Sequence, residues 1–126
     1  MVIQIDASDH TFFNSDQIFV DTNIWIYLFY PINNNDYGYS SVLQNMLDKK
    51  VQFYTTEQVL SEYVNRIVKS EFIRFRENQV GRVDYKRDFR PTSEYKDAYD
   101  MAMDSIREDI LPITKIVSLS PEDIYI

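Results

Sequence analysis

Apolar and polar positions along this chain follow two periods, one typical of buried strands and one typical of amphipathic helices. Three short runs of β-favouring residues are expected to form buried strands: 17–20, 51–54 and 113–119. Four stretches with apolar residues at helical spacing are expected to form helices: 22–30, 41–50, 55–72 and 93–111. Because strands and helices alternate, the sequence predicts an α/β fold with a parallel sheet of about three strands flanked by helices.

Polar residues at the expected helix starts support this reading. Asp21 or Thr22 can cap the first helix, directly after the first strand. Thr55 and Gln58 have the spacing of a capping box at the start of the third helix. Pro112 ends the fourth helix, because proline cannot continue it.

The end of the chain also carries a helix start. The segment 120–123 combines a cap, a proline for the first helical position and two acids for the first turn. Only residues 124–126 follow, too few for a useful helix. We therefore expect one domain over 1–126, truncated at its C-terminus, in which 1–16 form an N-terminal arm.

Composition narrows the class of protein. The chain has 126 residues, enough for one domain, and its 10 Tyr and 8 Phe can supply a core. It has no Cys, which fits a reducing cytoplasm and excludes thiolate metal sites. The longest apolar run, Ile24–Tyr30, is too short to span a membrane, and the N-terminus lacks the pattern of a secretory signal. We therefore expect a cytoplasmic protein without a membrane partner.

Charge is unevenly distributed. The formal net charge is −7, which does not favour polyanions through the average field. Residues 69–90, however, contain seven basic and four acidic side chains, a local excess of three positive charges. A mixed-charge, solvated surface explains such a stretch equally well. Asp97, Asp100 and Asp104 similarly have the spacing of a solvated helix face.

Two carboxylates are the best candidates for chemistry. Asp21 follows an apolar strand immediately, where open parallel sheets place their ligand sites. Glu62 flanks the apolar stripe of the third helix and can reach over the end of a neighbouring strand. For each of them the alternative is a structural role, as a helix cap for Asp21 and as a solvated side chain for Glu62.

Two short motifs contain these carboxylates. Residues 19–27, Phe-Val-Asp-Thr-Asn-Ile-Trp-Ile-Tyr, have an acid between an apolar strand and an apolar helix. This motif resembles the opening of PIN domains, a family of nucleases named after the N-terminal domain of PilT. Residues 59–66, Val-Leu-Ser-Glu-Tyr-Val-Asn-Arg, resemble its second motif, and 116–121 resemble the strand before its next one. The resemblance covers 17–126, which would be the N-terminal portion of a PIN-like fold.

The resemblance implies a function. PIN domains are endoribonucleases that cleave single-stranded RNA with Mg²⁺ or Mn²⁺, and many are toxins of toxin–antitoxin pairs. The resemblance to this family implies that Asp21 and Glu62 are catalytic residues and metal ligands. Such oxygen ligands suit these ions, which keep several waters. The family's further acids follow the third strand and have no match here, and an incomplete carboxylate set positions metal and water poorly, so we expect low or no ribonuclease activity from this chain. A non-catalytic PIN-like scaffold that binds a partner protein, such as an antitoxin, stays open.

Other chemistries have little support in the sequence. His10 is the single histidine, and there is no Gly-rich phosphate loop or zinc motif. An aspartyl phosphatase would need a second acid two residues after Asp21, where the chain has Asn23. In a truncated PIN-like sheet the strand 17–20 would be an open apolar edge, which predicts self-association or pairing with a partner chain.

Overall fold

A computed structural model describes residues 17–30 and 36–118, and the structural statements below concern this part of the chain. Ten elements follow one another, namely β1 (Gln17–Phe19), α1 (Thr22–Phe29), α2 (Tyr39–Asp48), β2 (Gln52–Thr55), α3 (Glu57–Glu77), the π-helical turn η2 (Tyr85–Phe89), α4 (Ser93–Ser105), the π-helical turn η3 (Ile106–Ile110), the 3-10 turn η4 (Leu111–Ile113) and β3 (Thr114–Ile116). The expected N-terminal arm and the helix start at 120–123 lie outside the described residues.

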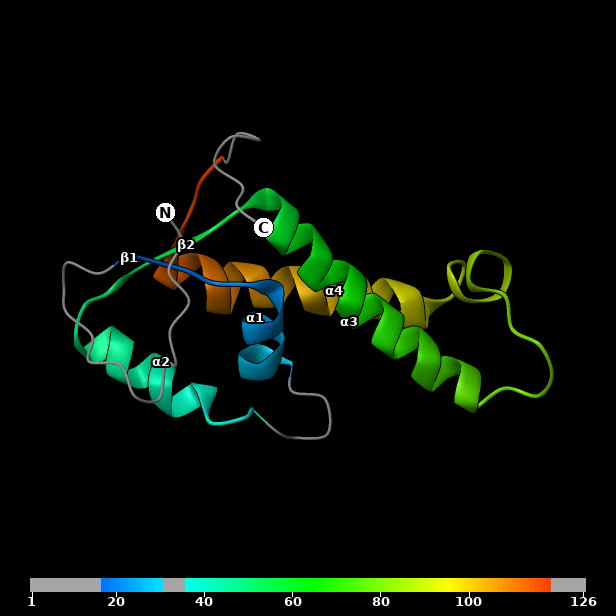
Figure 1. The fold of residues 1–126 in the computed structure, drawn as a ribbon. Coiled ribbons are helices and arrows are strands. Elements are labelled where there is room, and N and C mark those ends of the chain that lie inside the picture. Colours follow the sequence, from blue (N-terminus) through cyan, green and yellow to red (C-terminus); the bar gives the residue numbers. More distant parts are fainter. Residues whose placement is uncertain (1–16, 31–35, 119–126) are drawn as a thin grey trace, which may run out of the picture.

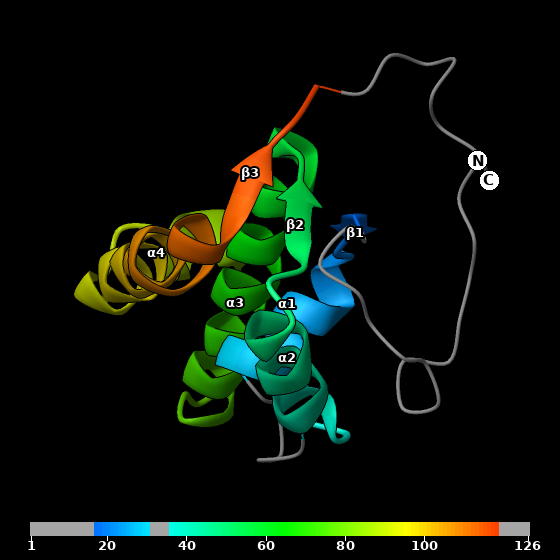
Figure 2. The same cartoon turned by 90° about the vertical axis from the view of Figure 1, so that its left-hand side faces the viewer.

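The three strands form one parallel sheet in the order β1-β2-β3 (Figure 2). In this register Ile18 lies beside Phe53, and Phe53 lies beside Thr114. This arrangement confirms the α/β class and the parallel, three-stranded sheet flanked by helices. The strands are shorter than expected at 17–20 and 113–119, because Val20 lies beyond β1 and Ile113 belongs to η4.

The helices pack around α3, the longest of them. Figure 1 shows α3 running from the sheet to the far end of the molecule, with α4 beside it and α1 against its N-terminal half. The largest fully buried side chains come from four different elements: Trp25, Phe53, Tyr63 and Phe89. No helix in the described ranges is both long enough and apolar enough to cross a membrane.

The cap of α3 differs from the expected capping box. Thr56 is the N-cap, and its hydroxyl accepts the backbone N–H of Val59 at 3.2 Å. Thr55 instead ends β2 and is fully buried, so the prediction of Thr55 as the cap was wrong. Two adjacent threonines with the same capping ability cannot be told apart by residue type, and strand pairing assigns Thr55 to the sheet.

An aromatic cluster joins the far end of α3 to η2 and α4. Its five members are Phe72, Phe75, Tyr85, Phe89 and Tyr95. Phe89 is at its centre, with four ring centroids between 5.2 and 5.7 Å away, and its own side chain is fully buried. The cluster therefore fixes the stretch between α3 and α4, which lies between the two helices predicted at 55–72 and 93–111.

Tyr30 connects the end of α1 to α3 and makes stability depend on alkaline pH. Its hydroxyl donates a hydrogen bond to Glu71, and burial, followed by this bond, raises the pKa of Tyr30 to about 12. Because an unfolded tyrosine ionises near pH 10, stability from this group is complete below pH 10 and is lost as the pH rises towards 12. We expect Tyr30→Phe to show a smaller loss of unfolding free energy than wild type between about pH 9 and 11.

Urea unfolding followed by circular dichroism at the two pH values measures this difference. Tyr99→Phe is the matched control, because Tyr99 is an exposed tyrosine on α4. An alkaline loss of the same size in wild type and Tyr30→Phe would contradict the assignment.

Candidate functional site

Asp21 lies at the junction of β1 and α1, at the carboxyl end of the first strand. Its backbone is extended, with φ −75° and ψ 158°, and its Oδ1 accepts the backbone N–H of Thr22 at 2.8 Å. Asp21 is therefore the N-cap of α1, which is the structural role considered for it in the sequence. The residue is exposed, so this capping role leaves the carboxylate accessible to solvent.

Thr22 connects Asp21 to the second candidate, Glu62. The Thr22 hydroxyl donates to Oε2 of Glu62 at 2.9 Å, while its backbone N–H is bound to Asp21. Since both bonds end on one residue, the bonded oxygens of the two carboxylates are at most about 10 Å apart. Thr22 is only 3% exposed, which holds this bridge in place.

A second bridge lies one turn further along α3. Arg66 donates a hydrogen bond from its guanidinium to the side-chain oxygen of Asn23. Glu62 and Arg66 are four residues apart on one helix, so they lie on the same face. Two side chains of α3, first Glu62 and one turn later Arg66, thus hold the first turn of α1 against α3 through hydrogen bonds.

The two carboxylates fit a hard divalent cation as a partial ligand set. One oxygen of each carboxylate accepts a hydrogen bond from Thr22, and the other oxygen makes no hydrogen bond within the described residues. Mg²⁺ and Mn²⁺ prefer oxygen ligands, and Mg²⁺ commonly binds through one or two carboxylates while keeping several waters. In the described ranges no group of three or more His, Cys, Asp or Glu side chains is placed to hold a metal ion.

The bridging role of Thr22 and the part played by Arg66 were not assigned from the sequence. The sequence indicates Thr22 as a candidate helix cap beside Asp21 and Arg66 as part of a motif, but it assigns neither of them a contact with a residue of the other helix. The four-residue spacing between Glu62 and Arg66 was the available signal for Arg66. The acidic stripe of Asp97, Asp100 and Asp104 is exposed on α4, while His10 lies outside the described residues.

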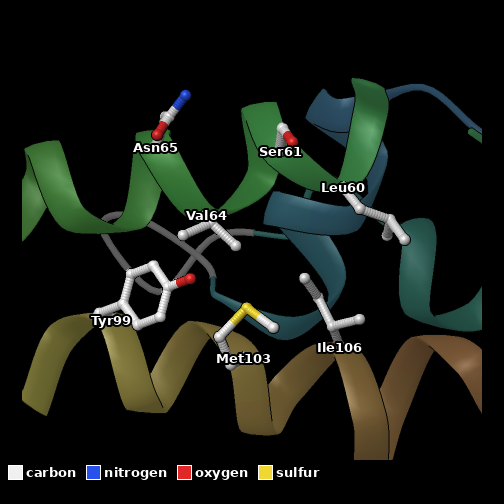
Figure 3. Close-up of a pocket in the computed structure, with 7 residues that line it drawn as sticks. All are labelled: Leu60, Ser61, Val64, Asn65, Tyr99, Met103 and Ile106. Carbon is white, nitrogen blue, oxygen red and sulfur yellow. The ribbon is translucent and has the colours of Figure 1, made fainter. Parts of the chain in front are cut away.

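A separate pocket of about 390 Å³ opens on the other side of α3, between α3 and α4. Figure 3 shows Val64 projecting from α3 and Met103 from α4 into the space between the two helices. Its lining is mostly apolar: Leu60, Ser61, Val64, Asn65, Tyr99, Met103 and Ile106. Because no ionisable acid or base other than a tyrosine lines it, this pocket is not where the carboxylate chemistry would take place.

Comparisons with protein-family models, with curated proteins and with solved structures find no match for this chain.

Proposed function

We propose that this chain is a PIN-like, metal-dependent endoribonuclease that cleaves single-stranded RNA, with Asp21 and Glu62 as catalytic metal ligands. The observation that supports this most is the bridge through Thr22, which connects two exposed carboxylates that are 41 residues apart in the sequence. The parallel sheet with an acid at the carboxyl end of β1 supports it as well, because open α/β sheets bind ligands at that end.

The residues divide the work in a simple way. Asp21 and Glu62 would hold Mg²⁺ or Mn²⁺, and the bound ion would lower the pKa of a water and offset charge on the scissile phosphate. Thr22 orients Glu62 through its hydroxyl and is a positioning residue. Arg66 and Asn23 fix the first turn of α1 relative to α3, so the distance between the two carboxylates is kept.

Incubation with labelled single-stranded RNA and Mn²⁺ tests this function. We expect slow cleavage, because Asp21 and Glu62 are only a partial ligand set, and this cleavage should require the cation and stop on addition of a chelator. Intact RNA under all cation conditions would overturn the proposal. Double-stranded RNA of the same sequence is the control substrate, and we expect it to be cut more slowly.

Thr22→Val is expected to weaken Mn²⁺ binding without unfolding the protein. Valine has a similar shape but cannot donate to Glu62, and loss of such an outer partner typically costs ten- to a hundredfold in metal affinity. Titration of Mn²⁺ followed by calorimetry measures the change. Thr22→Ser keeps the hydroxyl and should bind like wild type, so equal weakening in both variants would contradict a positioning role.

The second candidate function is a PIN-like scaffold that binds a partner protein, such as an antitoxin, without catalysis. The edge strand β1 favours it. Within the described residues β1 pairs only with β2, and the Phe19 side chain is 44% exposed. Val20 does not contribute to this edge, because it is buried and its N–H is bonded to Tyr54 at 3.0 Å. Either candidate belongs to a cytoplasmic toxin–antitoxin setting, and homo-oligomers through this edge are part of the scaffold hypothesis.

A further inference from the structure

The outer face of α3 carries a continuous row of exposed side chains that begins at the candidate site. Its buried residues, among them Tyr63 and Ile67, lie on one side of the helix. On the other side, residues 62, 66, 69, 73 and 76 follow one another at spacings of four and three residues, so they form one row along the helix, and all five are exposed. We call this row, consisting of Glu62, Arg66, Lys69, Ile73 and Arg76, the α3 ridge.

The α3 ridge changes character along its length. It starts with the Glu62 carboxylate, which Thr22 connects to Asp21, and continues with three cations. Between Arg66 and Arg76 it carries no carboxylate. Ile73, which is 38% exposed, adds an apolar contact among the cations. The ridge therefore joins an acidic, metal-compatible end to a cationic tail on a single rigid helix.

The cationic side chains are held in defined positions at both ends. Arg66 is bonded to Asn23 of α1. The Arg76 guanidinium lies over the ring of Phe72, 5.6 Å from its centroid, and that ring belongs to the aromatic cluster. With a rise of about 1.5 Å per residue, the ridge from Glu62 to Arg76 is about 21 Å long. A stacked single strand with about 3.4 Å per nucleotide would need about six nucleotides to follow it.

We infer that the α3 ridge binds the sugar–phosphate backbone of single-stranded RNA and leads it to the Asp21–Glu62 pair. The choice of RNA rests on the proposed nuclease function, but the binding surface does not depend on catalysis. Lys69 and Arg76 supply the phosphate contacts that are furthest from the carboxylates. Their contribution is electrostatic and independent of base sequence.

An acidic polypeptide fits the ridge less well than RNA does. It would be repelled at the Glu62 end, where the carboxylates of Asp21 and Glu62 both accept hydrogen bonds from Thr22. The RNA backbone would meet the same end through a bound cation, which would offset the charge of the phosphates and of the carboxylates. Single-stranded RNA therefore accounts both for the row of cations and for the carboxylate of Glu62 at its start.

The test compares two double variants with the same change in charge. Lys69→Gln with Arg76→Gln alters the ridge, whereas Lys96→Gln with Lys115→Gln removes two exposed lysines elsewhere. Binding of a fluorescently labelled ten-nucleotide RNA is followed by anisotropy in EDTA, so that no cleavage occurs. We expect affinity on the order of tenfold weaker for the ridge variant, and a salt slope smaller by about 1.4, with little change in the control.

Equal affinities in the two double variants would overturn the inference. So would displacement of RNA by polyglutamate as readily as by unlabelled RNA in a parallel titration with Ca²⁺, which also takes oxygen ligands. Circular dichroism checks the fold, and Lys69→Glu alone replaces the double variant if Arg76→Gln disturbs the aromatic cluster. Cleavage separates the two proposals. Ridge-dependent binding without any Mn²⁺-dependent cleavage supports the ridge and rejects the nuclease, whereas Asp21-dependent cleavage with ridge-independent binding does the reverse.

Discussion

Asp21→Asn is expected to reduce Mn²⁺-dependent cleavage of single-stranded RNA by on the order of a hundredfold or more, because it removes a charge that positions the cation. The fold should persist. Asn is as good an N-cap as Asp, and its side-chain oxygen can still accept the N–H of Thr22. Initial rates of cleavage at saturating Mn²⁺, together with thermal unfolding, measure both parts of this expectation.

Asp97→Asn is the matched control for Asp21→Asn. Asp97 belongs to the exposed acidic stripe on α4, so its replacement makes the same change in net charge away from the site. We expect wild-type rates from this variant. A similar loss of activity in both variants would mean that overall charge, not the Asp21 site, sets the rate. Full activity of Asp21→Asn would falsify its assignment as a metal ligand.

Phe89→Ala is expected to lower the free energy of unfolding by about 3–5 kcal/mol, the largest stability effect that we anticipate for a single substitution. Phe89 is fully buried and packs against four other rings, so alanine leaves a cavity that spans α3, η2 and α4. Urea unfolding followed by circular dichroism measures the change.

Tyr99→Ala serves as the comparison for Phe89→Ala, because it truncates an aromatic side chain that is 44% exposed. Its cost should be well below that of Phe89→Ala. If both substitutions cost the same small amount, the aromatic cluster does not hold α3 and α4 together.

Phe89→Ala has a second expected consequence, which concerns RNA binding. Phe72 supports Arg76 from within this cluster, so Phe89→Ala should also weaken RNA binding in EDTA.

The order of elements and the parallel sheet could be predicted because burial imposes clear periodicities on this chain. Val59, Tyr63, Val64, Ile67 and Val68 are all buried on α3, as their helical spacing indicated. The residues at which helices and strands begin and end were harder to predict, because they depend on contacts with segments that are distant in the sequence. Thr55 and Thr56 are equal in residue type, and only the pairing of β2 with β3 decides which of them caps α3.

The two carboxylates of the candidate site could be predicted from the sequence, but the hydrogen bonds that connect them could not. Asp21 stands out since a carboxylate directly after an apolar strand is costly without a partner. Glu62 lies on the helix that the sequence predicts, but helical spacing does not indicate that it faces the first turn of α1. The hydrogen bond from Thr22 depends on how α1 crosses α3, a long-range packing outcome that local patterns do not encode.

The sheet topology has a consequence for how the protein is made. β1 pairs with β2 across 35 positions of sequence, and β2 pairs with β3 across 61. Contacts between such distant segments form slowly, whereas the neighbouring helices α3 and α4 can associate early. On the ribosome, β2 cannot pair with β3 until Thr114 has left the exit tunnel. The nascent chain therefore carries an open central strand while the 61 positions from Phe53 to Thr114 are made, and we expect misassociation to be most frequent in this interval.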